Sequence, residues 1–533
     1  MGQIVVGMLR FAHSTADRTT PMLKSIMTVG GLTLLSRVTG FLRDIMLAAI
    51  LGAGPVADAF FIALRLPNHF RAIFAEGAFN AAFVPAYARI RGERGGAPAK
   101  LFADRVFTML FATEALLLAV ALLFTPAVIS LLAPGFNADP ERFALAVELT
   151  RITFPYLLLV TLVTLYGGIL NALQRFASPA AAPILLNLSM MATLALAAFF
   201  PTAGHAAAWG VFIAGCLEAA MVAADLGRDE GLPRFRTLRV DDDVRRFFRA
   251  LGPAVLGSAG TQIALFADTI IASFLAAGAV SALYYADRIN QLPIGVIGIA
   301  VGTVLLPEMA SRIAVGDERG ARRAQDRAIE FALLLSIPCV AAFGTVPDLI
   351  MLALFSRGAF TAADAAAAGA TLGAYAVGLL PFVLLRAVSA SFLARGDTAT
   401  PVKALAVAVV INIALKILLM DRYAQVGLAF ATSVGVWVNF ILLVWFAHRR
   451  RLISFDDHLR SSGMKLALSG LALAAALLVA AGPVIRKCEA LGTARFVAAL
   501  GILAVLGAAV YGGAVAILCG PGWLREFGRR RAT

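Results

Sequence analysis

Long apolar runs recur along this 533-residue chain from near its beginning to near its end. Many contain about 20 residues, enough for an α-helix to cross a hydrocarbon layer roughly 30 Å thick. A membrane helix also satisfies its own backbone hydrogen bonds, which lipid cannot do for it. The sequence is therefore expected to fold as an all-α polytopic membrane protein.

The composition supports this fold class. Hydrophobic residues make up 60% of the chain, charged residues 15%, and the mean hydropathy is +0.85, whereas a soluble globular chain is roughly 45–50% apolar. The net charge is +14, but a nucleic-acid partner would need a broad aqueous basic face. We expect no nucleic-acid partner and attribute the charge to membrane topology.

Apolar runs, punctuated by Gly, Pro and charged residues, predict fourteen spans. They lie at about residues 25–53, 57–88, 103–133, 145–173, 178–200, 206–225, 247–276, 279–311, 328–355, 367–394, 401–420, 424–448, 464–484 and 495–519. An even number of spans with a cytoplasmic start places both termini in the cytoplasm.

The distribution of Lys and Arg agrees with this topology, since most of them lie on the predicted inside. The clearest clusters are Arg89, Arg91, Arg94, Lys100 and Arg105 after the second span, Arg319, Arg322, Arg323 and Arg327 after the eighth, and Arg449–Arg451 after the twelfth. One predicted outside loop, with Arg486, Lys487 and Arg495, runs against the rule. Such clusters fix orientation and can also contact anionic lipid headgroups.

The two halves of the chain match weakly but collinearly when one is shifted by about 222 to 226 residues. Leu51–Val56 pairs with Leu275–Val280, and Leu186–Leu188 pairs with Ile411–Ile413. Six spans separate the copies, so both have the same orientation in the membrane. Parallel six-helix lobes of this kind are typical of transporters that hold their substrate between them.

The spans and the repeat together predict the organisation of the chain. The expected parts are a cytoplasmic N-terminal tail (1–24), an N-lobe with spans 1 to 6 (25–225), a cytoplasmic linker (226–246), a C-lobe with spans 7 to 12 (247–448), a second cytoplasmic linker (449–463), two additional spans (464–519) and a basic cytoplasmic tail (520–533).

Several basic residues lie within the predicted spans, where each costs roughly 2.5–3.5 kcal/mol unless it faces water, a partner or the interface. They are Arg37, Arg43, Arg65, Arg71, Arg151, Arg288, Arg386 and Lys416. The acidic candidates near the first of them, Asp44, Asp58 and Glu76, are fewer. Positive charge is therefore left over on the first two spans.

The spacing of the residues on the first span is informative. Ser36 and Arg43 are seven residues apart and share a helix face, as do Arg37 and Asp44. A bend at Gly40 would turn both arginines toward one cavity.

Arg71 follows Pro67-Asn68 by one turn on the second span, and Asp287-Arg288 occupies the repeat-equivalent stretch of the other lobe. We therefore expect arginines from both lobes near the centre. A guanidinium donates two hydrogen bonds to a phosphate and stays charged when desolvated, so the predicted substrate carries phosphate. The alternative is that these arginines snorkel or pair with nearby carboxylates.

Enzymatic motifs are not evident in the sequence. The five histidines are scattered, and the four cysteines form no CxxC pair that would indicate a zinc site. Asp268, on the seventh span, is a candidate ligand for a proton or a cation, or a partner for a nearby polar group. We expect a transporter and no bound metal or other cofactor.

Five motifs closely resemble the MurJ/MviN-type lipid II flippases. They are Ser36–Asp44 (SRVTGFLRD), Ala57–Phe61 (ADAFF), Leu66–Asn68 (LPN) followed by Arg71, Phe74–Phe79 (FAEGAF) and Tyr284–Arg288 (YYADR). The resemblance extends from about residue 25 to the fourteenth span. It implies the two-lobed fold of the multidrug/oligosaccharidyl-lipid/polysaccharide exporter superfamily.

The resemblance also implies the function: export of lipid II, the undecaprenyl-pyrophosphate-linked peptidoglycan precursor, to the outer leaflet of the bacterial inner membrane. Membrane lipids and the cell-wall synthesis machinery would then be its other partners. Arg37, Arg43, Arg71 and Arg288 match positions that bind the headgroup, and spans 464–484 and 495–519 match a groove for the lipid tail. The matching positions that support this site or its gating are Ser36, Asp44, Asp58, Asn68, Glu76 and Asp287.

One position departs from the resemblance. Some family members hold sodium between the seventh and eleventh spans, using a carboxylate one turn after an asparagine such as Asn412, but here that position is Lys416. We therefore expect coupling to membrane potential or to protons rather than to sodium.

The sequence favours an alternating-access flippase whose outer gate is formed by Gly54-Pro55 and the turn at 276–279. Three alternatives are a flippase for another undecaprenyl-linked oligosaccharide, a cation or drug antiporter of the same superfamily, and a non-transporting scaffold for envelope assembly. An antiporter cavity would be dominated by carboxylates, and a scaffold would have no use for unpaired buried arginines.

Overall fold

The computed structural model describes residues 2–74, 78–228, 230–453 and 456–529. Within these ranges the regular elements are all helices. Contacts between residues divide the chain into two compact units: unit 1 comprises Met1–Leu51 and Ala59–Leu265, and unit 2 comprises Gly52–Asp58 and Phe266–Thr533. The division falls inside α2 (Pro55–Phe74) and inside α10 (Asp242–Ser273).

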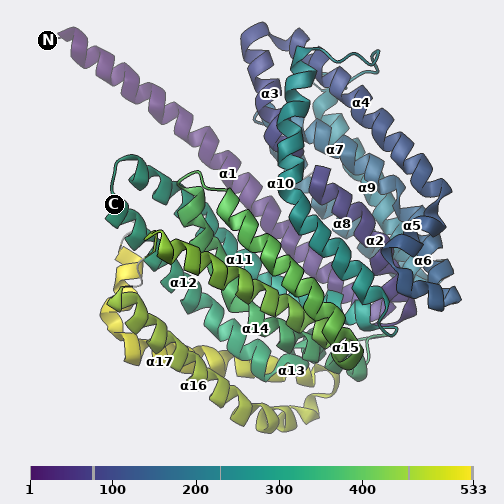
Figure 1. Ribbon diagram of the computed structural model, residues 1–533, viewed down its shortest axis with the longest axis vertical. Coiled ribbons are helices and arrows are strands. Elements are labelled where there is room, and N and C mark those ends of the chain that lie inside the picture. Colours follow the sequence, from purple (N-terminus) through teal and green to yellow (C-terminus); the bar gives the residue numbers. More distant parts are fainter. Residues whose placement is uncertain (1, 75–77, 229, 454–455, 530–533) are drawn as a thin grey trace. The chain divides into compact units, whose positions relative to one another are not determined.

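The other helices of unit 1 are α1 (Gly2–Leu51), α3 (Ala78–Arg94), α4 (Gly96–Leu123), α5 (Thr125–Leu132), η1 (Pro134–Ala138), α6 (Pro140–Thr153), α7 (Pro155–Ala172), α8 (Ala177–Ala195), η2 (Ala197–Phe199) and α9 (Ala203–Gly227). In Figure 1, α1 is one continuous helix that includes most of the predicted N-terminal tail.

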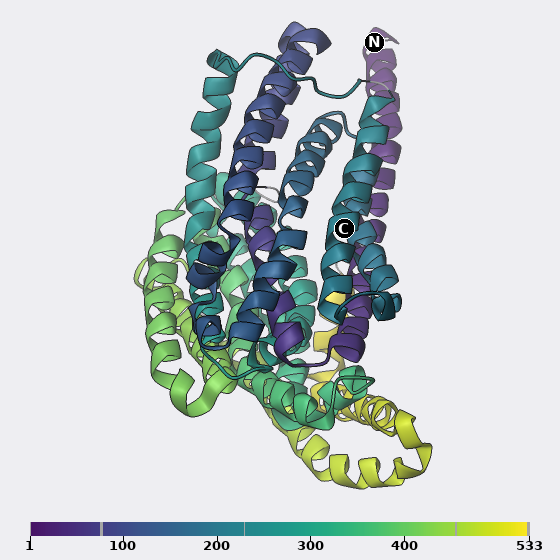
Figure 2. The ribbon, with the colours of Figure 1, turned by 90° about the vertical axis from the view of Figure 1, so that its right-hand side faces the viewer.

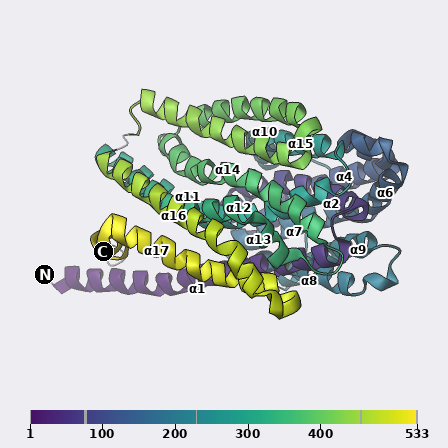
Figure 3. The same cartoon turned by 90° about the horizontal axis from the view of Figure 1, so that it is seen from below.

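The other helices of unit 2 are α11 (Ala279–Ala314), α12 (Glu318–Thr345), α13 (Pro347–Phe355), α14 (Ala362–Leu393), α15 (Ala399–Arg449), α16 (Asp457–Lys487), η3 (Glu489–Ala494) and α17 (Arg495–Arg529). Figure 3 shows α16 and α17, which contact each other along their lengths, side by side.

Ten helical segments among the described residues are long and apolar enough to cross a membrane. The chain is therefore a multi-pass membrane protein. Ala399–Arg449 counts as one of these segments, but its backbone departs from helical geometry at Ala424, where φ is 45° and ψ is −130°. This break lies at the boundary between the predicted spans 401–420 and 424–448.

Prolines explain where other predicted spans are divided into two helices. Pro126 lies in the first turn of α5, Pro155 begins α7 and Pro347 begins α13. Proline has no amide hydrogen and clashes with the carbonyl four residues before it, so it is accommodated best at the start of a helix. The predicted spans 103–133, 145–173 and 328–355 accordingly each consist of two helices.

Aromatic rings form the centre of unit 1. The Phe79 and Phe83 rings of α3 stack with centroids 5.0 Å apart, and Phe83 stacks on Phe102 of α4 at 5.6 Å. Phe247 of α10 meets Phe79 edge-on at 5.7 Å. Each such pair contributes about 0.5–1.5 kcal/mol beyond its buried area, so these contacts hold α3, α4 and α10 together.

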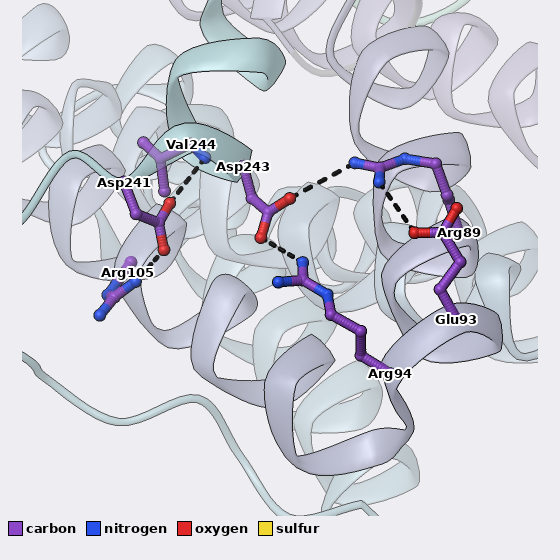
Figure 4. Close-up of polar contacts among 7 residues, drawn as sticks. All are labelled: Arg89, Glu93, Arg94, Arg105, Asp241, Asp243 and Val244. Carbon is purple, nitrogen blue, oxygen red and sulfur yellow. Dashed lines mark hydrogen bonds and ion pairs between the residues drawn. The ribbon is translucent and has the colours of Figure 1, made fainter.

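Ion pairs fasten the same three helices at one end of unit 1. Asp243 of α10 pairs with both Arg89 and Arg94 of α3, and Asp241 pairs with Arg105 of α4 (Figure 4). Three arginines of the predicted basic cluster after the second span are therefore paired here with carboxylates at or just before the start of α10. Charge pairing across helices at this end adds to the aromatic packing.

The predicted cytoplasmic linker 226–246 packs against α4. The backbone amide of Arg234 donates to Asp104 Oδ1 at 2.9 Å, and the Phe235 ring lies between Phe107 and Phe111, with centroids 4.9 and 5.1 Å away. Figure 2 shows this connection as the teal segment near the top. The linker is therefore anchored to the body of unit 1.

In unit 2 the turn between α14 and α15 is held by a carboxylate outside the spans. Asp397 accepts hydrogen bonds from the backbone amide of Thr400 at 3.0 Å and from its hydroxyl at 2.7 Å, and it pairs with Arg450. These interactions, led by the Thr400 amide, lower the pKa of Asp397 to about 2.

Asp397→Asn should lower the stability of unit 2 at neutral pH by about 1 kcal/mol, because the amide keeps an acceptor oxygen but loses the charge that strengthens these hydrogen bonds and pairs with Arg450. A depressed carboxyl pKa stabilises the fold fully above the unfolded pKa of about 3.9, and this contribution is lost as the pH falls through about 2. At pH 7 the variant should have a lower midpoint of thermal unfolding than the wild type. Near pH 2 the two midpoints should be nearly equal. Asp421→Asn, at an exposed position on α15, is the control, and an equal effect at both pH values would contradict the assignment.

Candidate functional site

A polar cluster between α1 and α8 lies inside unit 1. The Arg43 guanidinium donates to Asp44 Oδ1 from Nε at 3.1 Å and from Nη2 at 2.7 Å, and from Nη1 to Asn187 Oδ1 at 2.9 Å. Arg43, Asp44 and Asn187 are only 8%, 3% and 4% exposed. Arg43 is therefore held within the helix bundle in this conformation.

Asn187 completes this cluster. Its amide nitrogen donates to the backbone carbonyl of Ser36 and to Thr39 Oγ1, both at 3.0 Å. A Cβ at Gly40 would lie 3.4 Å from the same nitrogen, so the amide packs directly against α1 at this glycine. Sequence reasoning used Asn187 only to align the repeats and missed this role; the signal was a lone amide in an apolar span.

Arg37 is exposed, unlike Arg43, although both lie on α1. Ser36 is half-buried and contributes its backbone carbonyl to the Asn187 cluster. The helix therefore separates the two arginines by environment: Arg43 joins the polar cluster and Arg37 is accessible. An accessible guanidinium keeps its donors available for a phosphate.

The predicted site residues on the second span lie in or just beyond α2. Asn68 is half-buried. The backbone of Arg71 belongs to α2, but the structure does not describe its side chain. Glu76 lies outside the described residues. Pro67, inside α2, cannot donate to the carbonyl of Ala63. The Thr153 hydroxyl of α6 donates to that carbonyl at 3.0 Å, so a side chain replaces the missing bond.

Asp58 binds the start of α11 within unit 2. Its carboxylate is fully buried and accepts from the amides of Gly278 and Ser281, each at 2.8 Å, and from the Ser281 hydroxyl at 2.6 Å. A carboxylate at a helix N-terminus is favoured by the helix dipole.

Glycine is required at this junction. Gly278 has a φ of 90°, and a Cβ there would lie 3.1 Å from the carbonyl oxygen of Ala53. The segments Gly54-Pro55 and 276–279, predicted to form a gate, are thus brought together in this unit by Asp58 and close backbone packing.

Asp287 and Arg288 are half-buried on α11. The Arg288 guanidinium carbon lies 4.7 Å from the centre of the Tyr284 ring, a cation–π contact. Asp287 Oδ1 accepts a hydrogen bond from Gln291 Nε2 at 3.4 Å. Arg288 is therefore oriented by an aromatic face.

Lys416 of α15 forms an ion pair with Asp268 of α10 inside unit 2. The Lys416 side chain is 2% exposed and that of Asp268 31%. The sequence left the role of Lys416 open and gave Asp268 a pairing alternative, and the structure shows that pair. The Asp268 carboxylate is thus paired with an ammonium group in this conformation.

A protein-family model described as "Lipid II flippase MurJ" matches residues 47–498 of this chain. A protein of Rhizobium meliloti (strain 1021) named "Probable lipid II flippase MurJ" is 42% identical over 470 residues, which cover 86% of each chain.

Two solved structures show the same fold. One described as "Lipid II flippase MurJ, inward closed conformation" has a TM-score of 0.76 at 23% identity and covers 94% of this chain and 99% of its own. An inward-facing multidrug resistance MATE family transporter of the MOP superfamily has a TM-score of 0.63 at 17% identity, covering 81% and 98%.

Asn187→Ala should destabilise unit 1, because Arg43 Nη1 would lose its acceptor in a buried place. Leaving a buried charged donor unsatisfied costs about 1–3 kcal/mol or more. Thermal unfolding of the purified protein in detergent should show a lower midpoint than the wild type. Asn137→Ala, an exposed amide that bonds Ser130, should change the midpoint little; equal midpoints for Asn187→Ala and wild type would argue against the cluster.

Proposed function

The chain belongs to the lipid II flippase MurJ family, and we propose that it moves lipid II from the inner to the outer leaflet of the bacterial cytoplasmic membrane for cell-wall synthesis. The observation that carries this proposal is the family match over residues 47–498, which include Arg71 and Arg288. Substrate transport without covalent chemistry is the expected activity, with membrane lipids and cell-wall synthesis enzymes as its neighbours.

The proposed mechanism is alternating access. The pyrophosphate and headgroup enter a cavity open to the cytoplasm and bind Arg37, Arg43, Arg71 and Arg288, while the polyprenyl tail stays in lipid. The cavity then closes on the inside and opens on the outside. The Asp58 junction supports a gating role for Gly54-Pro55 and 276–279, since opening there would require breaking its hydrogen bonds to α11.

The arginines are expected to contribute differently. Arg37 is exposed, so it would receive the phosphate without losing an internal partner. Arg43 already donates to Asp44 and Asn187, so binding through Arg43 would require it to leave one of them. We therefore assign the first phosphate contact to Arg37, and a later contact or a supporting role to Arg43.

The proposed topology has fourteen spans, two six-span lobes and both termini in the cytoplasm. If α15 forms two spans divided at Ala424, the number of spans exceeds the ten apolar helical segments, in the direction of the proposed fourteen. The apolar helices α16 and α17 expose large side chains such as Leu471, Val479, Val505 and Ile517. These helices are proposed to hold the polyprenyl tail, for which such a surface is suited.

Coupling to sodium is not expected. The buried ammonium of Lys416 supplies Asp268 with the positive charge that a bound cation would otherwise provide. Membrane potential or protons would then drive the cycle; one elementary charge moved across 100 mV is worth about 2.3 kcal/mol.

Arg37→Ala should fail to sustain growth of cells in which this protein is the only lipid II flippase. Loss of a charge-assisted contact to phosphate costs about 1.5–3 kcal/mol, roughly 10- to 150-fold in headgroup affinity. Arg37→Lys should retain part of the activity because it keeps the positive charge, but not all of it, because lysine cannot form the bidentate hydrogen bonds of a guanidinium. After depletion of the wild type, labelled lipid II should accumulate in the inner leaflet.

Arg486→Ala, in the last turn of α16, is the matched control and should support growth. Protein levels of all variants are compared by immunoblotting. Full growth and a normal leaflet distribution in both Arg37→Ala and Arg288→Ala would overturn the proposed site. Accumulation of a different undecaprenyl-linked lipid after depletion would instead identify another substrate.

Replacement of sodium by potassium or choline should leave lipid II export by the wild type unchanged. Lys416→Ala should reduce export, because removing one partner of a buried ion pair leaves the Asp268 charge uncompensated, at a cost of about 3–5 kcal/mol. Lys403→Ala, at an exposed position of the same helix, should behave as the wild type. If the wild-type protein stopped exporting lipid II in sodium-free medium, the proposed independence of sodium would be refuted.

A further inference from the structure

A buried glutamate in unit 1 is not used by the proposed mechanism. Glu114, on α4, is only 4% exposed. It borders a cavity of about 150 Å³. Its carboxyl oxygen Oε2 has no hydrogen-bond partner within the part of the chain that the structure describes. A carboxyl group in this state needs an explanation, because buried polar groups are almost always hydrogen-bonded.

The surroundings of the Glu114 carboxyl are apolar. The cavity is formed by α3, α4, α7 and α10, and besides Glu114 it is lined by Phe79, Met109, Leu110, Thr113, Leu117, Thr161, Thr164, Phe248 and Leu251. Among these lining residues from the four helices, Glu114 alone is titratable. The wall thus contains no cation that would stabilise an ionised carboxylate.

Two of the three threonine hydroxyl groups in the wall, those of α7, are already engaged. Thr161 donates to the carbonyl of Leu157 at 3.0 Å, and Thr164 donates to that of Val160 at 2.8 Å. Each of these two hydroxyl groups therefore donates its only proton to a carbonyl of its own helix and has none left for Glu114. A buried water needs roughly two to four polar partners, and the mostly apolar wall offers few besides Glu114 itself.

Protonation resolves the difficulty. An isolated ionised carboxylate in apolar surroundings costs many kcal/mol, whereas the neutral acid costs only what any polar group does. We propose that Glu114 is a proton-binding site within unit 1 and holds a proton in the conformation described here. The ligand is a proton taken from water, and binding converts the carboxylate to the carboxylic acid.

The adjoining cavity gives this site a way to exchange its proton. A rotation of α4, α7 or α10 that admits water would solvate the carboxylate and release the proton, and closure would favour uptake. This consequence rests on the proposed function, in which the helices move during each cycle. Proton binding itself does not depend on which substrate is carried.

Infrared difference spectroscopy of the full-length protein in lipid nanodiscs tests the site directly. At pH 7 the wild type should show the C=O stretch of a buried carboxylic acid that Glu114→Gln lacks. Glu141→Gln, which removes an exposed carboxylate in the first turn of α6, should leave that band unchanged. Absence of the band from the wild type at pH 7 would overturn the proposal, whether or not the protein moves lipid II.

A transport measurement then tests coupling. Glu114→Gln mimics the protonated acid and should fold normally, but the dependence of lipid II export on an imposed pH gradient should be lost. Arg37→Ala should abolish export at every pH, which separates failure of the substrate site from failure of the proton site. An unchanged pH dependence in Glu114→Gln would remove Glu114 from the transport cycle.

Discussion

The rest of the structure depends on one constraint: inside a membrane, every polar group must find its partner within the protein. Helices meet this requirement for the backbone, and side chains repair the places where helices fail. Pro67 interrupts α2 and leaves the carbonyl of Ala63 without its usual donor, and the hydroxyl of Thr153 from α6 supplies one. The proline can therefore bend a membrane helix without leaving a carbonyl unpaired.

The same constraint explains where charges lie. Arg43 is buried with Asp44 and Asn187 around it, and Asp58 is buried against three donors at the start of α11. Both clusters hold helices in position, and both lie at positions that the family resemblance associates with transport.

Much of the helical architecture could be predicted from the sequence, because length and hydropathy constrain a membrane helix strongly. The prolines that begin α7 and α13 were visible too, but their effect on helix continuity depends on how the neighbouring helix accommodates the bend. The partners of the polar residues could not be predicted. Arg43 and Asn187 are 144 residues apart, and Lys416 and Asp268 are 148 apart. No helical periodicity connects such pairs; only the packing of the helices selects them.

The arginines on α1 show why the sequence could not rank its own candidates. Arg37 and Arg43 have the same chemistry and lie six residues apart, yet Arg37 is exposed and Arg43 is buried, at 8% exposure. The difference comes from α8, whose Asn187 reaches α1 beside Gly40. A guanidinium that already has a carboxylate and an amide gains less from a phosphate than an exposed one, because it must first give up those bonds. For the proposed site, the availability of each arginine, rather than the number of arginines, is therefore what we expect to set where an anionic headgroup binds first.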